Sequence, residues 1–221
     1  AVWAAAASGT TGVLLELIAA GADVNSNNKF GRSPLQAAAA GGHCETVLLL
    51  IAAGAELDAC DDDGETALYA AAFENHPATV VALVSSGCCV DGGVVDDGGL
   101  SVTECPYEPI SSETPNAMGS PSLTKKSSIG KTHGHSTPPP LVGACWRGNA
   151  AAVAALLADG PGEWPDLERV TDDGRTALTA SCWRGHHHCV KLLLGTCIIS
   201  PVSSNRILPT LLRANPYPRH P

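Results

Sequence analysis

The sequence predicts an all-α solenoid of about five helix-turn-helix repeats, interrupted by one disordered insertion. The first observation behind this prediction is a spacing of 33 residues, at which Gly31 is followed by Gly64 and Val47 by Val80. The second is composition, because 44% of the 221 residues are hydrophobic but only 4% are aromatic. The core must therefore be built from Ala, Val and Leu. Repeats of this kind bury their faces on one another and need no single large core.

The segment 31–58 shows how one repeat is built. Ser33 is a suitable N-cap, Pro34 suits the first helical position, and Gln36 completes a capping box. This first helix runs over four alanines and is expected to end at the glycines 41–42. A second helix follows with an apolar stripe at positions i, i+3 and i+4, formed by Val47, Leu50 and Ile51.

Short blocks at equivalent places in the repeats identify a family. The first helices begin with Ser33-Pro34-Leu35-Gln36, Thr66-Ala67-Leu68-Tyr69 and Thr176-Ala177-Leu178-Thr179. Each block is followed by a helix of the form V-x-x-L-[LIV], and the first two repeats then close with G-A-x-[LV]-[DN] or a close variant. In this register the blocks resemble the ankyrin repeat and its T-P-L-H motif, although none keeps all four letters. The resemblance implies binding of proteins through the finger loops and the concave face formed by the first helices.

The period divides the chain into four parts. Residues 1–91 hold repeats 1–3, of which the first is incomplete, and residues 140–194 hold repeats 4 and 5. Gly, Pro, Ser and Thr make up more than half of residues 92–139, which predicts a disordered insertion. Several prolines interrupt residues 195–221, which are expected to form an irregular tail.

Charge and hydropathy narrow the classes of partner. The net charge of −9 argues against a nucleic-acid-binding surface. No apolar run approaches the ~18 residues that a membrane span requires. The nine cysteines show no disulfide or zinc-finger spacing, so they indicate a reducing, intracellular compartment, cytoplasmic or nuclear.

The sequence indicates no catalytic residue, no metal site and no cofactor. His186-His187-His188-Cys189, with Cys182 before it, is the strongest candidate for zinc. Adjacent helical residues point about 100° apart, however, so three consecutive histidines cannot converge on one ion. His186 also has the place of His43, the histidine that follows the mid-repeat glycine.

Six candidate binding residues occupy one pair of positions in three successive repeats: Phe73, Glu74, Trp146, Arg147, Trp183 and Arg184. Family analogy places these positions on the concave face. Trp and Arg often dominate binding energy, so the two Trp-Arg pairs are expected to form a docking strip. The alternative is that each Trp only packs against the neighbouring repeat.

The loop from Asp58 to Glu65 is the most acidic stretch, with Asp61, Asp62 and Asp63 at its centre. It lacks the spacing of a calcium-binding loop. We expect these three aspartates to attract a basic segment of a protein partner.

The predicted function is that of a non-catalytic scaffold or adaptor that binds another protein through the concave face and the finger loops. The alternative is a regulatory or targeting ankyrin arm of a larger catalytic or membrane channel protein. The full-length chain would separate the two.

Overall fold

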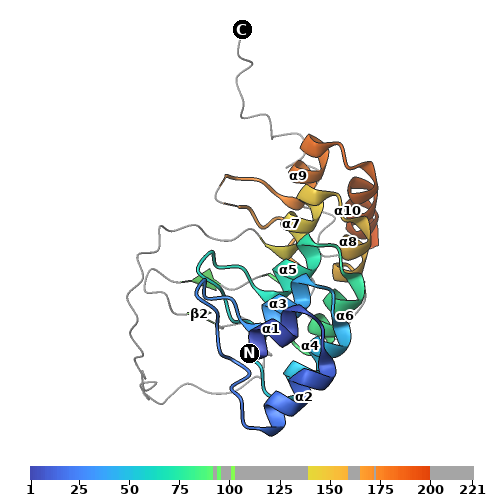
Figure 1. Ribbon diagram of the computed structural model, residues 1–221. Coiled ribbons are helices and arrows are strands. Elements are labelled where there is room, and N and C mark those ends of the chain that lie inside the picture. Colours follow the sequence, from blue (N-terminus) through green and yellow to red (C-terminus); the bar gives the residue numbers. More distant parts are fainter. Residues whose placement is uncertain (92–93, 96–100, 103–138, 159–164, 172, 200–221) are drawn as a thin grey trace, which may run out of the picture.

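The computed structural model describes residues 1–91, 94–95, 101–102, 139–158, 165–171 and 173–199. Two layers of short helices stack along one axis (Figure 1). The first layer holds the first helix of each repeat: α1 (Val2–Ala7), α3 (Pro34–Ala40), α5 (Ala67–Phe73), α7 (Pro140–Arg147) and α9 (Ala177–Arg184). The second layer holds the partners: α2 (Thr11–Ala19), α4 (Cys44–Ala52), α6 (Pro77–Ser85), α8 (Ala150–Leu156) and α10 (His187–Ile199).

The local signals in the sequence set where the first helices begin. Ser33 Oγ accepts a hydrogen bond from Gln36 N at 3.2 Å, and Ser33 N donates to Gln36 Oε1 at 2.7 Å. The capping box predicted for α3 is therefore confirmed. Thr176 and Thr179 form a second capping box at α9.

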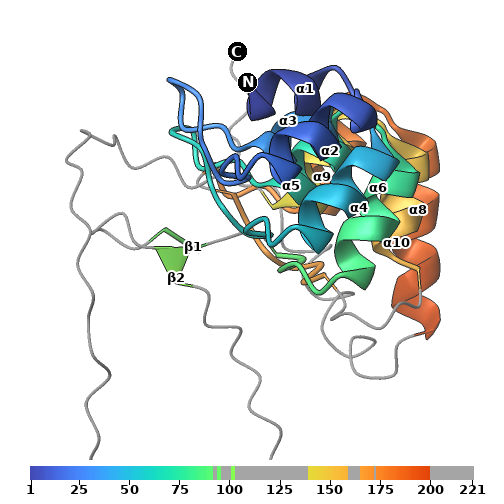
Figure 2. The same cartoon turned by 60° about the horizontal axis from the view of Figure 1, so that its bottom comes forward.

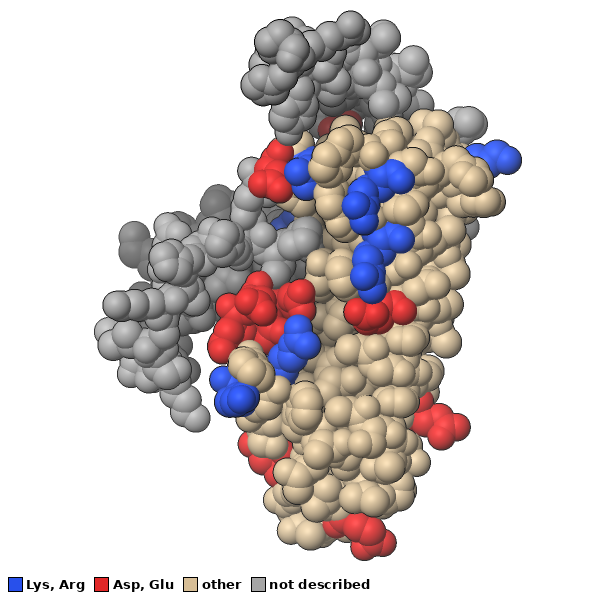
Figure 3. Space-filling model, turned by 45° about the horizontal axis from the view of Figure 1, so that its top comes forward, with Lys and Arg blue, Asp and Glu red and all other residues tan. Residues whose placement is uncertain are grey.

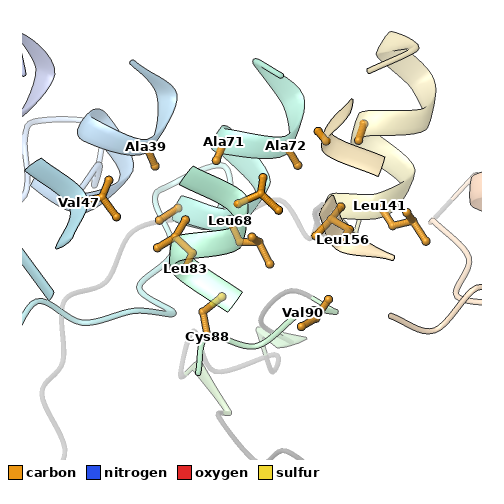
Figure 4. Close-up of a cluster of buried hydrophobic side chains, with 14 of the residues drawn as sticks. Ala39, Val47, Leu68, Ala71, Ala72, Leu83, Cys88, Val90, Leu141 and Leu156 are labelled. Atoms are coloured by element: carbon orange, nitrogen blue, oxygen red, sulfur yellow. The ribbon is translucent and has the colours of Figure 1, made fainter. Parts of the chain in front are cut away.

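The core lies between the two layers and continues from repeat to repeat. Leu35, Leu68 and Leu141 occupy equivalent positions in α3, α5 and α7, and each is at most 2% exposed. Figure 4 shows Leu68 and Leu83 beside Ala71 and Ala72, where the short alanines let neighbouring helices approach. The predicted core of Ala, Val and Leu is thus confirmed.

Glycines in the left-handed conformation make room for a histidine of the next repeat. Gly42 has φ +69°, and a Cβ added to it would lie 2.7 Å from two carbon atoms of the His76 ring. His76 Nε2 in turn lies 3.0 Å from the Ala40 carbonyl oxygen, which accepts its hydrogen bond. Two further pairs repeat this arrangement: Gly9 with His43 and Gly148 with His186. The three pairs tie α1, α3 and α7 to the repeat that follows each of them.

Repeats 3 and 4 pack as neighbours although 48 residues separate them in the sequence. At this junction Asn75 stands where the other repeats have glycine, and it still adopts φ +64°. The shorter Asn149 stands where repeats 2, 3 and 5 have histidine, and its Nδ2 donates to the carbonyl oxygens of Ala72 at 2.9 Å and Phe73 at 2.6 Å. The two departures occur together because the Cβ of Asn75 leaves no space for an imidazole.

Two segments differ from the sequence prediction. In the region predicted to be disordered, β1 (Val94–Val95) pairs antiparallel with β2 (Ser101–Val102), and Val94 lies opposite Val102. Most of that region and residues 200–221 lie outside the described residues. The helix α10 continues to Ile199, past the predicted end at 194. Gly195 does not stop it, since a glycine ends a helix by adopting a left-handed conformation and Gly195 does not adopt one.

Candidate functional site: the concave face

One helical position defines the surface of the first-helix layer. It is occupied by Ala7, Ala40, Phe73, Trp146 and Trp183 in the five repeats. The finger loops, which join each repeat to the next first helix, project on the same side of the molecule (Figure 2). We call this surface the concave face. Small residues in repeats 1 and 2 leave it hollow, and large aromatic residues fill it in repeats 3 to 5.

The predicted docking residues of repeats 3 to 5 come together as a stacked cluster. The ring centroids of Trp146 and Trp183 are 5.2 Å apart. The Arg147 guanidinium carbon lies 4.5 Å from the Phe73 centroid, and that of Arg184 lies 4.9 Å from the Trp146 centroid. Each arginine therefore stacks on the aromatic ring of the preceding repeat, not on the tryptophan beside it in the sequence.

Arg175 completes this cluster from a finger loop. Its guanidinium carbon lies 4.9 Å from the centroids of both Trp146 and Trp183. The sequence analysis missed it, although Arg32, Glu65 and Arg175 share one repeat position just before a helix N-cap. We call the six residues the aromatic–arginine strip: Phe73, Trp146, Trp183, Arg147, Arg175 and Arg184. Figure 3 shows basic side chains gathered in a band on this part of the surface.

Two carboxylates already contact the strip. Arg147 Nη2 lies 3.3 Å from Glu74 Oε2, and Arg175 Nη1 lies 3.4 Å from Asp173 Oδ2. These pairs are well exposed, so they contribute little to stability. They show that the stacked guanidinium groups keep N–H edges that can donate to a carboxylate.

The two tryptophans differ in exposure. Trp183 is 69% exposed, whereas Trp146 is half-buried and packs partly against the core. Packing against the neighbouring repeat thus explains the presence of a large side chain at Trp146 in part, but it does not explain the largely exposed side chain of Trp183. The ring of Tyr69 stacks on that of Phe73, with 5.5 Å between the ring centroids. Burial, the main cause, raises the pKa of Tyr69 to about 12.

In the acidic finger, Asp61 differs from Asp62 and Asp63 in its surroundings. Its side chain is 2% exposed, and Oδ2 accepts a hydrogen bond from Arg32 Nε at 3.0 Å. Its Oδ1 accepts from the backbone N–H groups of Asp63 and Glu65 at 3.1 and 2.8 Å. Both oxygens therefore hold the loop together, and the expectation that Asp61 attracts a basic segment of a partner stays a prediction. Asp62 and Asp63 are exposed.

Glu65 and Arg32 extend this cluster into the concave face. Arg32 Nη2 donates to Glu65 Oε2 at 2.8 Å. Burial first and the neighbouring Asp61 second raise the pKa of Glu65, and the opposing effect of Arg32 does not cancel them. One guanidinium group thus faces two carboxylates, so the cluster keeps an excess of negative charge.

The histidines and cysteines show no arrangement for metal binding or catalysis in the described residues. No group of three His, Cys, Asp or Glu side chains there is placed to hold a metal ion. His186 Nε2 instead lies 3.1 Å from the Trp146 carbonyl oxygen. Burial raises the pKa of the Cys145 thiol and of Cys88, the latter to about 12, which opposes a role as nucleophile.

The fold and the face define a helical repeat protein with one long binding surface. A family model of three ankyrin repeats matches residues 2–92, and a single ankyrin repeat matches residues 173–202. The two matches cover more than half of the chain, which belongs to the ankyrin-repeat family. The comparison with curated proteins gave no match.

Membership of this family indicates the general kind of function. Ankyrin repeats generally mediate protein–protein interaction and are typically non-catalytic. In the described part of the chain, no helix has the length and apolar character needed to cross a membrane.

Proposed function

We propose that this chain is a scaffold or adaptor that binds a protein partner along the concave face, with the aromatic–arginine strip as the main contact. The observation that carries the proposal is the exposure of Trp183 within a stack of aromatic and guanidinium groups. An exposed tryptophan held in one orientation by its neighbours loses little conformational entropy on binding. Trp and Arg are also enriched among residues that dominate binding energy.

The charges of the face support a partner segment of complementary charge. Arg184 stacks on Trp146 and has no ion-pair partner within the described residues, so its N–H groups are free to meet a carboxylate. Asp62 and Asp63 on the acidic finger attract basic side chains. The proposed partner therefore carries acidic residues over the strip and a basic segment over the finger.

Replacing Trp183 by alanine is expected to weaken partner binding by about 2 kcal/mol, or roughly 30-fold. Because the side chain is largely exposed, the melting temperature should stay nearly unchanged. Trp146→Ala is a less clean test because that side chain also packs on the core. The measurement is quantitative capture of partners from lysate by the wild type and the variant, followed by the affinity of the purified pair.

The matched control is Leu48→Ala. Leu48 is 49% exposed but lies on α4, in the other helix layer. This variant should keep the affinity of the wild type. Equal binding by the Trp183 variant and the wild type, with Leu48→Ala impaired, would refute the proposal.

A further inference from the structure

The concave face holds a second feature, a cavity of about 210 Å³ in repeats 1 to 3. It lies where the repeat position of Trp146 and Trp183 is occupied by alanine, at Ala7 and Ala40. Its apolar walls are these two alanines with Ala37, Ala70 and the half-buried Trp3. The cavity is therefore the hollow that a larger side chain would fill.

One side of the cavity is polar and negatively charged. Arg32, Asp61 and Glu65 line it, together with Gln36 and Thr66. The Arg32 guanidinium is held by Asp61 at 3.0 Å and by Glu65 at 2.8 Å, so its donors are engaged from two sides. Gln36 Nε2 donates to the Glu65 carbonyl oxygen, which ties the finger to α3. The polar wall is thus built and fixed before any partner arrives.

We propose that this cavity receives a lysine or arginine side chain of the protein partner, with its aliphatic stem against the alanines and Trp3 and its cationic group at Glu65. The apolar walls suit the methylene chain of such a residue, and the excess carboxylate suits its charge. An anionic side chain would meet two carboxylates, and a purely apolar one would add no second positive charge to the single guanidinium of Arg32 that Asp61 and Glu65 share. The proposal rests on the proposed function, since it supposes a partner on the concave face.

The raised pKa of Glu65 supports a cationic side chain as the occupant of the cavity. Burial and Asp61 raise its pKa, which means that the site disfavours the ionised form when it is empty. A cation that enters the cavity reverses this effect because it stabilises the ionised carboxylate. Arg32 alone does not supply enough positive charge for both carboxylates.

The test uses the whole chain with ¹⁵N-labelled tryptophan, in which the indole signal of Trp3 reports on the cavity. The probes are the N-methylamides of Nα-acetyl-lysine, -arginine, -norleucine and -glutamate. The lysine and arginine probes should shift the Trp3 signal in a saturable way that weakens as salt rises. The norleucine probe has the aliphatic stem without the charge, and the glutamate probe has the opposite charge. Both should shift the Trp3 signal at least tenfold less.

Two variants make the test specific. Glu65→Gln keeps the shape and an acceptor for Arg32 but removes the charge, and Ala40→Phe fills the hollow with the residue that repeat 3 has at this position. Each variant should weaken binding of the lysine probe at least tenfold, while Trp183→Ala should leave the affinity for this probe unchanged. Equal shifts from norleucine and lysine, or full binding by Glu65→Gln, would overturn the proposal.

The outcomes also separate this inference from the proposed function. Loss of partner binding by Trp183→Ala with no response of Trp3 to the cationic probes would leave the proposed function in place and refute the cavity. A specific response of Trp3 with unchanged partner affinity of the Trp183 variant would support the cavity and refute the strip.

Discussion

Replacing Gly42 by alanine is expected to lower the free energy of unfolding by about 3 kcal/mol. The left-handed conformation at φ +69° costs an alanine about 1–2 kcal/mol. The new Cβ would also overlap the His76 ring and displace it from the Ala40 carbonyl oxygen, at a further cost of about 1–2 kcal/mol. Urea unfolding followed by circular dichroism measures the loss.

The chain offers a matched control for this substitution. Gly54 has φ +88°, but nothing lies within 4 Å of a Cβ added there. Gly54→Ala should therefore cost only the conformational part, about 1–2 kcal/mol. If Gly42→Ala were no more harmful than Gly54→Ala, the contact with His76 would contribute nothing to the stack.

Replacing Asn149 by histidine is expected to cost about 2 kcal/mol, and a second substitution of Asn75 by glycine should recover most of it. The imidazole of Asn149→His would meet the Cβ of Asn75, and the two hydrogen bonds of Asn149 would be lost. With glycine at position 75 the junction has the Gly–His arrangement of the other repeats. A double-mutant cycle measures the recovery as a coupling energy.

This cycle tests whether repeats 3 and 4 stack directly across the intervening segment. Asn75→Gly alone should change stability little, because asparagine tolerates φ +64° better than most residues. Additive effects of the two substitutions would show that positions 75 and 149 do not meet in solution.

The periodicity was enough to predict the helix pairs and their stacking, because each repeat carries its own start signals and apolar stripe. It also placed Phe73, Trp146 and Trp183 at one position, and the structure brings their repeats side by side. The sequence also shows that Asn75 and Asn149 depart together from the glycine and histidine found at these positions elsewhere in the chain. This paired departure could have predicted the junction between repeats 3 and 4 without coordinates.

The finger loops account for most of what the sequence did not predict. Their backbone repeats one turn, in which Asn28, Asp61 and Thr171 occupy equivalent positions, but the side chains on it differ from repeat to repeat. The sequence therefore did not show that Arg175 lies over both tryptophans or that Asp61 lies buried against Arg32. One signal was present, since Arg32 and Glu65 are 33 residues apart and equivalent residues of adjacent repeats lie close together. The end of α10 was missed because the irregular tail was inferred from prolines, and the first of these, Pro201, comes only after the helix has ended at Ile199.

The other helix layer offers the main rival to the concave face. Leu15, Leu48 and Val81 occupy equivalent positions in α2, α4 and α6 and are each about half exposed. Such an apolar row is a candidate contact surface in its own right. It lacks the charged and aromatic groups that give the concave face its directional contacts.

Site-specific photo-crosslinking tests directly which of the two faces binds the partner. A benzophenone amino acid is placed at position 183 in one variant and at position 48 in another, and both are irradiated in lysate of the native cells. Docking on the concave face predicts a discrete adduct at position 183 that excess wild-type chain removes, with no competed adduct at position 48. A competed adduct at position 48 and none at position 183 would contradict it.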